Sequence, residues 1–230
     1  MKHAWRSTVT DAAIALVCGA IVLTTAAGVT ERRQTAATSA PYILIDAGHG
    51  GEDGGAVAAD GTVEKEINLA VALPLRDLLS VMGFSVVMTR ETDTMLHGGE
   101  ATLRERKVAD MKRRLDMVQT ARLTVSLHQN KFEQTKYSGT QVFYSPNAPE
   151  SREIAQAIQE TVVSLLQPHN TRPLKAGDST VYLLHRATAP IVLVECGFLS
   201  NKAECEKLKT RAYQRQMAFA VAGGVMKGLA

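Results

Sequence analysis

The sequence predicts an α/β fold, a single domain with a mainly parallel, twisted sheet that helices cover on both faces. Apolar runs of strand length alternate with longer segments that repeat apolar residues at helical spacing, which is typical of a parallel sheet. Three of the runs, YILI, LTVSL and IVLV, lack the in-and-out alternation of a half-exposed strand. This pattern indicates strands that are buried on both faces. Residues 41–230 are enough chain for one well-buried core.

The first forty residues are typical of a targeting segment and a linker. A basic start precedes an apolar run over 12–29, which is the order of an export signal. The run also reaches the lower length limit of a membrane-spanning helix. We therefore expect 1–29 to be either a cleaved signal peptide or an N-terminal membrane anchor, followed by a polar linker over 30–40 and the domain over 41–230. Because positive charge precedes the apolar run, the domain is expected outside the cytoplasm, secreted or membrane-anchored.

Charge and cysteine content exclude two classes of partner. The net charge is +3, and no basic stripe is interleaved with aromatic residues, so no nucleic-acid partner is expected. Only Cys196 and Cys205 fall within the expected domain, and their spacing fits no cysteine-ligated metal. We expect two thiols, with a disulfide as the alternative.

Periodicity places the elements of the N-terminal half. The apolar run that ends at DAGHGG predicts a strand over 42–46. Apolar residues recur at helical spacing over 67–81, and Pro74 within this segment is expected to kink or restart the helix. The run FSVVMT predicts a strand over 84–89, and a polar loop over 91–102 follows.

A charged helix is expected over 103–120. Val108, Met111, Leu115 and Val118 recur on one face and form its apolar stripe. Basic residues are interspersed with acidic ones over the remainder of the helix: Arg104, Arg106, Lys107, Lys112, Arg113 and Arg114. Such a pattern is typical of a solvated face, and contact with an anionic partner is the alternative.

The C-terminal half continues the alternation of strands and helices. Strands are expected over 123–127, 140–144 and 191–195. Helices are expected over 150–166, 202–208 and 211–228. The segment 168–179 is expected to be a loop, and the chain contains no internal repeat.

Two histidines and a glutamate stand at or just after the ends of buried strands. His49 follows the first strand, His128 follows 123–127, and Glu195 ends 191–195. Open α/β sheets hold ligands beyond the carboxyl ends of their strands, so we expect the three side chains to lie together. An unpaired carboxylate is costly in a core, and this favours a functional role for Glu195.

We assign His49, Glu64 and His128 as the ligands of one catalytic Zn²⁺ ion. Imidazole and carboxylate suit zinc, and three protein ligands leave a position for water. Glu64 starts the first helix, where a carboxylate is also common without any metal. Cys196 offers an alternative nucleophile, but adjacent strand residues face opposite ways, so a site-facing Glu195 turns Cys196 towards the core. His185 is a secondary candidate for lining the site, and the other histidines are expected to be structural.

Four motifs occur in a fixed order along the domain: DAGHGG at 46–51, EKEINL at 64–69, SLHQN at 126–130 and VECGFLSN at 194–201. Together they resemble the zinc-dependent N-acetylmuramoyl-L-alanine amidases of the amidase-3 type, which cleave peptidoglycan; alanine replaces proline in the first motif. The resemblance runs from Tyr42 to the C-terminus. It implies that His49, Glu64 and His128 bind zinc, that Glu195 is the catalytic glutamate, and that the partner is peptidoglycan.

Within this family the chain looks most like the germination-specific, spore-cortex branch. The similar segments are VVMTRETD, YSGTQVFYSPN and VYLL. The resemblance implies hydrolysis of the amide between the lactyl group of MurNAc and L-Ala, as a step towards muramic-δ-lactam, in the forespore envelope. Two alternatives stay open: a zinc peptidase or deacetylase that acts on wall material, and a catalytically silent wall-binding scaffold. An intermediate case is an amidase that stays inactive until a protein partner improves its zinc binding, so a partner that controls activity is also considered.

Overall fold

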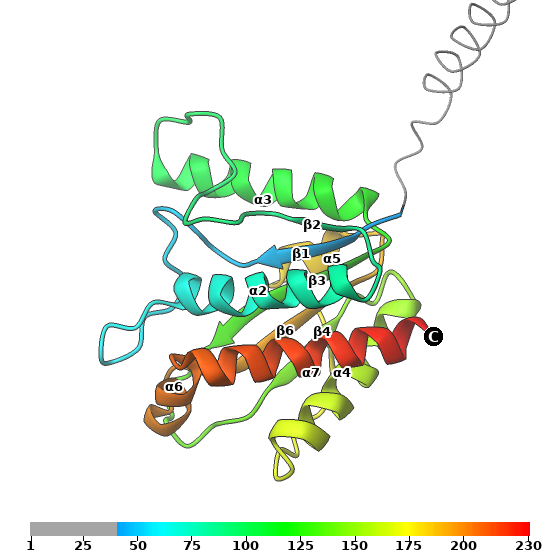
Figure 1. The fold of residues 1–230 in the computed structure, drawn as a ribbon. Helices are drawn as coiled ribbons and strands as arrows, with labels where there is room; N and C mark the ends of the chain where they lie inside the picture. The colour runs from blue at the N-terminus through cyan, green and yellow to red at the C-terminus, as the bar shows by residue number, and fades with distance from the viewer. Residues whose placement is uncertain (1–40) are drawn as a thin grey trace, which may run out of the picture. The chain divides into compact units, whose positions relative to one another are not determined.

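The computed structural model describes residues 41–230, so the expected signal peptide or anchor and the linker lie outside the described residues. Within 41–230 the chain forms three layers, with one six-stranded sheet between two sets of helices (Figure 1). The α/β class and the mainly parallel, doubly covered sheet are confirmed. In this part of the chain no helix combines the length and the apolar character needed to cross a bilayer.

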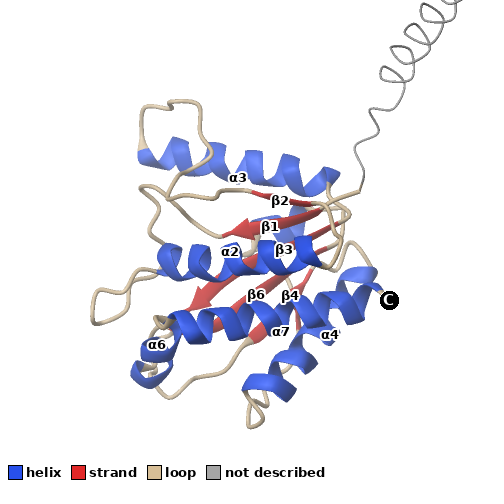
Figure 2. Cartoon of the chain, in the orientation of Figure 1, coloured by secondary structure: helices blue, strands red, loops and turns tan. Residues whose placement is uncertain are grey.

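The sheet places the strands far from their order in the sequence. Its order is β2-β1-β3-β6-β4-β5, and all of these strands except β5 are labelled in Figure 2. Strands β2, β1, β3 and β6 run parallel, whereas β4 runs antiparallel to β6. The bounds are β1 Ile43–Ala47, β2 Val86–Met88, β3 Leu123–Asn130, β4 Gln141–Tyr144, β5 Lys175–Ala176 and β6 Ile191–Phe198.

Two apolar cores hold the helices against the sheet. Alternate strand residues supply them: Ile43 and Ile45 face the core under α2, α4 and α7, whereas Leu44 faces the core under α3 and α5. The helix bounds are α2 Glu64–Val81, α3 Leu103–Thr120, α4 Glu150–Leu166, α5 Tyr182–Arg186, α6 Lys202–Leu208 and α7 Arg211–Leu229. The chain thus buries both sheet faces, as its uninterrupted apolar strands require.

Helix α2 is continuous through Pro74, so the expected restart at this residue is wrong. An interior proline costs about 3 kcal/mol because it removes one hydrogen bond and crowds the preceding turn. The buried stripe Val71, Leu75 and Leu79 passes across this position without a break. Packing of that stripe against the sheet therefore holds the helix together.

Helix α3 begins as expected, because Thr102 and Glu105 form a capping box at its start. Its buried face differs from the expected one. Arg114 is 2% exposed, so its assignment to a solvated basic face is wrong, whereas Val108 from the expected apolar stripe is 50% exposed. The physical reason is a carboxylate in β1 that Arg114 reaches, as described below.

The remaining differences are in short elements and strand ends. The segment expected as one loop contains β5, and α5 follows it. Strands β3 and β6 each continue three residues beyond their expected ends, because they pair with each other as far as Asn130 and Phe198. The register shifts between His128 and Asn130, so the ladder is irregular directly after His128.

Candidate active site

The three proposed metal ligands gather at the carboxyl edge of the sheet. His49 follows β1, Glu64 is the first residue of α2, and His128 lies in β3. One ligand atom from each lies within 4.8 Å of the others. Nε2 of His49 is 3.3 Å from Oε2 of Glu64, and Nδ1 of His128 is 2.9 Å from Oε1 of the same carboxylate. Residues from three distant segments thus converge on one carboxylate.

A left-handed backbone conformation aims the His49 ring. Its φ of 61° makes His49 the one non-glycine residue with positive φ in the described chain. The ring is held by Asp53, whose Oδ2 lies 2.8 Å from Nδ1. Nδ1 therefore donates to a carboxylate, and Nε2 is left to face Glu64, which is the usual arrangement of a metal-binding histidine. Sequence reasoning missed Asp53, although a carboxylate four residues after His49 was the available signal.

Glu64 is fixed as an anion although it is 3% exposed. The backbone N–H of Ala56 donates to Oε2 at 2.8 Å, and that of Gln129 donates to Oε1 at 3.1 Å. Burial opposes ionisation, but contacts with His128 and His49 hold the pKa of Glu64 well below its usual range. The carboxylate is thus charged and oriented before any cation arrives.

The His128 ring lies directly over Gly48. A Cβ atom at Gly48 would come within 2.2 Å of Nε2 of His128, which no side chain can tolerate. The ring centroids of His128 and His49 are 4.9 Å apart, nearly edge to face. Glycine at this position of the DAGHGG motif is therefore required for the second histidine to enter the site.

Glu195 lies beside His128 in the parallel ladder of β3 and β6, so both side chains point to the α3 side of the sheet. Its Oε2 atom is buried and has no hydrogen-bond partner among the described residues. Burial raises the pKa of Glu195 to about 7, with His128 opposing the shift and Glu64 adding to it. The expected site glutamate is thus close to the candidate ligands and poised to exchange a proton near neutral pH.

A buried ion-pair network holds the DAGHGG loop from the α3 side of the sheet. Asp46 pairs with Arg114 of α3 and accepts from the Ser126 hydroxyl at 2.6 Å. Arg114 also donates to Asp110 at 2.7 Å and to the carbonyl of His49 at 2.8 Å. Burial opposes ionisation of Asp46, but Arg114 and the hydrogen bonds hold its pKa below the usual range. Sequence reasoning missed this network.

A second arginine holds the same loop from the other side. Arg90 is buried, and its guanidinium donates to the carbonyls of Ala47 at 2.9 Å, Gly48 at 3.1 Å and Lys65 at 2.7 Å. These contacts tie the loop after β1 to the first turn of α2. The backbone that carries His49 is therefore fixed relative to Glu64.

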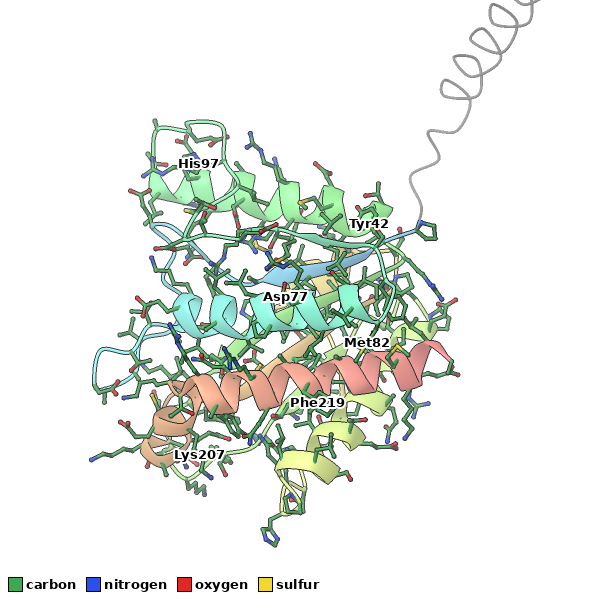
Figure 3. All side chains as sticks on the ribbon, in the orientation of Figure 1. Tyr42, Asp77, Met82, His97, Lys207 and Phe219 are labelled. Atoms are coloured by element: carbon green, nitrogen blue, oxygen red, sulfur yellow. The ribbon has the colours of Figure 1, made fainter. Side chains whose placement is uncertain are left out.

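The secondary candidates lie elsewhere. Cys196 is fully buried in the core under α2, α4 and α7, on the sheet face opposite Glu195, and burial raises the pKa of its thiol to about 12. This placement opposes the alternative of a cysteine nucleophile. Cys196 and Cys205 are both free thiols. His185 is exposed on α5, and His97 lies in the loop before α3 (Figure 3), so neither joins the ligand cluster.

Known proteins resemble this chain in sequence and in fold. A family profile described as N-acetylmuramoyl-L-alanine amidase, Amidase_3, matches residues 43–227. Over 192 residues the chain is 36% identical to the germination-specific N-acetylmuramoyl-L-alanine amidase of Bacillus subtilis (strain 168), which covers 82% of this chain and 80% of that protein. A solved structure of the CwlD amidase from Clostridioides difficile, in complex with the GerS lipoprotein, superposes with a TM-score of 0.79. It is 41% identical and covers 83% of this chain and 98% of that one. A solved structure of an N-acetylmuramoyl-L-alanine amidase from Clostridium difficile 630 is 30% identical, with a TM-score of 0.71. The match covers 83% of this chain and 98% of that one.

Proposed function

The chain belongs to the Amidase_3 family of N-acetylmuramoyl-L-alanine amidases, and from its site we propose that it removes peptide stems from spore-cortex peptidoglycan. The reaction is hydrolysis of the amide between the lactyl group of N-acetylmuramic acid and L-alanine, as a step towards muramic-δ-lactam. The observation that carries this proposal is the presence of His49, Glu64, His128 and Glu195 at one edge of a fold shared with a germination-specific amidase.

The resident metal in this proposal is one zinc ion held by His49, Glu64 and His128. Two imidazole nitrogens and one carboxylate oxygen within 4.8 Å of one another fit a divalent ion of this kind. The groups that hold these ligands fit as well, because Asp53 orients the His49 ring and backbone N–H groups orient Glu64. When bound, zinc supplies Lewis-acid polarisation of the scissile carbonyl and of the attacking water.

Glu195 handles the protons in this mechanism. Its unpartnered Oε2 accepts a proton from the attacking water and delivers it to the departing L-alanine amine. A pKa of about 7, raised by burial, suits a group that must act first as a base and then as an acid. A cation at the neighbouring ligands favours the ionised form, so the base is ready when substrate binds.

Mass analysis of digested cortex tests the proposed function. The full chain loaded with zinc should release peptides that begin with L-alanine and leave the glycan intact. Cleavage within the peptide would identify a peptidase, and release of acetate would identify a deacetylase. Binding without any product would identify a silent scaffold. The Glu195→Gln variant serves as the control, because it should bind zinc and release peptide about 10²–10⁴-fold more slowly.

A controlling protein partner and an extracytoplasmic location are part of the proposal. The neighbour from Clostridioides difficile is described in complex with a lipoprotein, which supports a partner of that type for this chain. Wall peptidoglycan lies outside the cytoplasm, so the domain would act there, secreted or anchored. Zinc per chain and peptide release should both rise when a membrane lipoprotein from the same cell is purified together with the amidase. Equal values with and without that lipoprotein would contradict this part of the proposal.

A further inference from the structure

An open apolar groove lies along the first turns of α3, beside the start of α5. Its apolar wall consists of Leu103, Val108, Met111 and Tyr182. Leu103 is 43% exposed, Val108 50% and Tyr182 36%. Four large apolar side chains line one hollow of about 620 Å³, which lies within the volume range of ligand pockets. Val108 was expected in the core of the domain and is instead part of this groove.

Cations border the groove. Arg104, Lys107 and Lys112 belong to its lining, and all three lie in the first three turns of α3. Within residues 41–230, neither Arg104 nor Lys112 forms an ion pair or a side-chain hydrogen bond. Solvated cations beside an apolar hollow complement a ligand that combines apolar faces with negative charge.

A chain of side-chain contacts links the groove wall to the candidate active site. Nζ of Lys107, in the groove wall, lies 2.8 Å from Oδ1 of Asp53. The other oxygen of Asp53 lies 2.8 Å from Nδ1 of His49. A single carboxylate thus separates the groove from a proposed metal ligand. The groove also lies on the sheet face towards which Glu195 points, because α3 and α5 cover that face.

We propose that this groove binds the glycan strand next to the muramoyl residue being cleaved. The inference rests on the proposed function. Sugar rings present apolar faces that can lie against Tyr182, Val108 and Met111. The strand also carries carboxylates in both states: on the peptide stems before cleavage, and on the lactyl groups that hydrolysis of the amide leaves behind. Arg104 and Lys112 complement this charge. The contacts from Lys107 through Asp53 to His49 favour the substrate over a protein partner as the occupant.

Two substrates of different length test the inference. The polymer is purified cortex glycan with its peptides. The short substrate is a soluble N-acetylmuramoyl peptide with a single sugar, which lacks the neighbouring sugars that the groove would hold. Tyr182→Ala and Lys112→Glu should each lower kcat/KM on the polymer about tenfold, mainly through KM. Both variants should stay within about twofold of the parent on the short substrate.

The matched controls lie on the opposite face of the sheet. Phe219→Ala removes another exposed aromatic side chain, from α7 (Figure 3), and Arg215→Glu reverses another exposed charge on the same helix. Neither control should change kcat/KM on either substrate. Equal losses on the polymer in the control and groove variants would overturn the inference, as would equal losses on both substrates in the groove variants.

A binding measurement separates this inference from the proposed function. Zinc-loaded full chain with Glu195→Gln is sedimented with glycan strands from which the peptides have been stripped. The groove variants in this background should bind the strands about tenfold more weakly than the parent, and less salt-dependently for Lys112→Glu. Groove variants that bind the strands as tightly as the parent would overturn the inference. So would groove variants that lose only their activation by a lipoprotein and keep their binding to the strands. If the parent protein releases no peptide, the proposed function is wrong. The sedimentation result would still show whether the groove binds glycan strands.

Discussion

Replacing Arg114 with methionine should destabilise the whole domain, although neighbouring basic residues on α3 are exposed. Arg114 is 2% exposed, and its guanidinium lies between Asp46 and Asp110. It also donates to the carbonyls of Ala47 at 3.0 Å and His49 at 2.8 Å. The substitution therefore leaves two buried carboxylates without their cation and frees two carbonyls of the metal-site loop.

The expected loss follows from the cost of an uncompensated buried charge. Removing one member of a buried ion pair costs about 3–5 kcal/mol, and the whole stability of a domain is about 5–15 kcal/mol. We therefore expect Arg114→Met to lose at least about 3 kcal/mol. Arg114→Lys keeps the charge but not the planar fork that reaches both carboxylates, so its loss should be intermediate.

Urea unfolding at neutral pH in the presence of a chelator measures this loss without a contribution from zinc binding. Arg113→Met, at the exposed neighbouring position, should stay within about 0.5 kcal/mol of the parent. Adding Asp46→Asn to Arg114→Met removes one orphaned charge, so the double variant should lose less than the sum of the single ones. A loss below about 1 kcal/mol for Arg114→Met would refute the reasoning.

Three further predictions concern the metal site. Glu195→Gln should lower peptide release by about 10²–10⁴-fold with zinc per chain unchanged, and normal release would remove Glu195 from the chemistry. Asp53→Ala should weaken zinc binding by about 10–100-fold in a chelator competition, and unchanged affinity would show that the His49 ring needs no support. The third concerns pH. In the metal-free protein burial opposes protonation of His49, but hydrogen bonds to Asp53 and Glu64 raise its pKa to about 9. Zinc must displace that proton, so its affinity should rise between pH 7 and pH 9. The stability of the metal-free protein should depend on pH in the opposite direction. The charged His49 ring contributes its full stabilisation at pH values below its unfolded pKa of about 6.5, and this contribution should be lost as pH rises through about 9. Equilibrium dialysis and chelated urea unfolding at several pH values check both trends, and a flat profile in either would contradict them.

The sequence was sufficient to place the candidate site because its residues sit where parallel strands end. His49, His128 and Glu195 each follow or end an apolar run, and the carboxyl ends of such strands share one edge. Glu64 could be placed only as the start of a helix. Its approach to both histidines depends on the loop between β1 and α2, whose path no periodicity encodes.

Arg114 shows why the supporting network could not be predicted. Its neighbours on α3 are charged and exposed, so nothing local distinguishes the one arginine that turns inward. What distinguishes it is Asp46 on β1, a contact between residues far apart in the chain. The short elements β5 and α5 were not predicted for a related reason, since two and five residues are too few to show a hydrophobic period.

The order of the central strands also bears on how the chain folds during synthesis. Strand β1 pairs Ile43 with Leu123 of β3, and β3 in turn pairs Thr124 with Ile191 of β6. Neither of these two pairings joins strands that are consecutive in the sequence, and the second awaits residues 191–198. Such non-local pairing slows folding, because closing a long loop costs chain entropy before any native contact has formed to offset that cost. A ribosome-bound chain that stops short of residue 191 should lack a protease-resistant core.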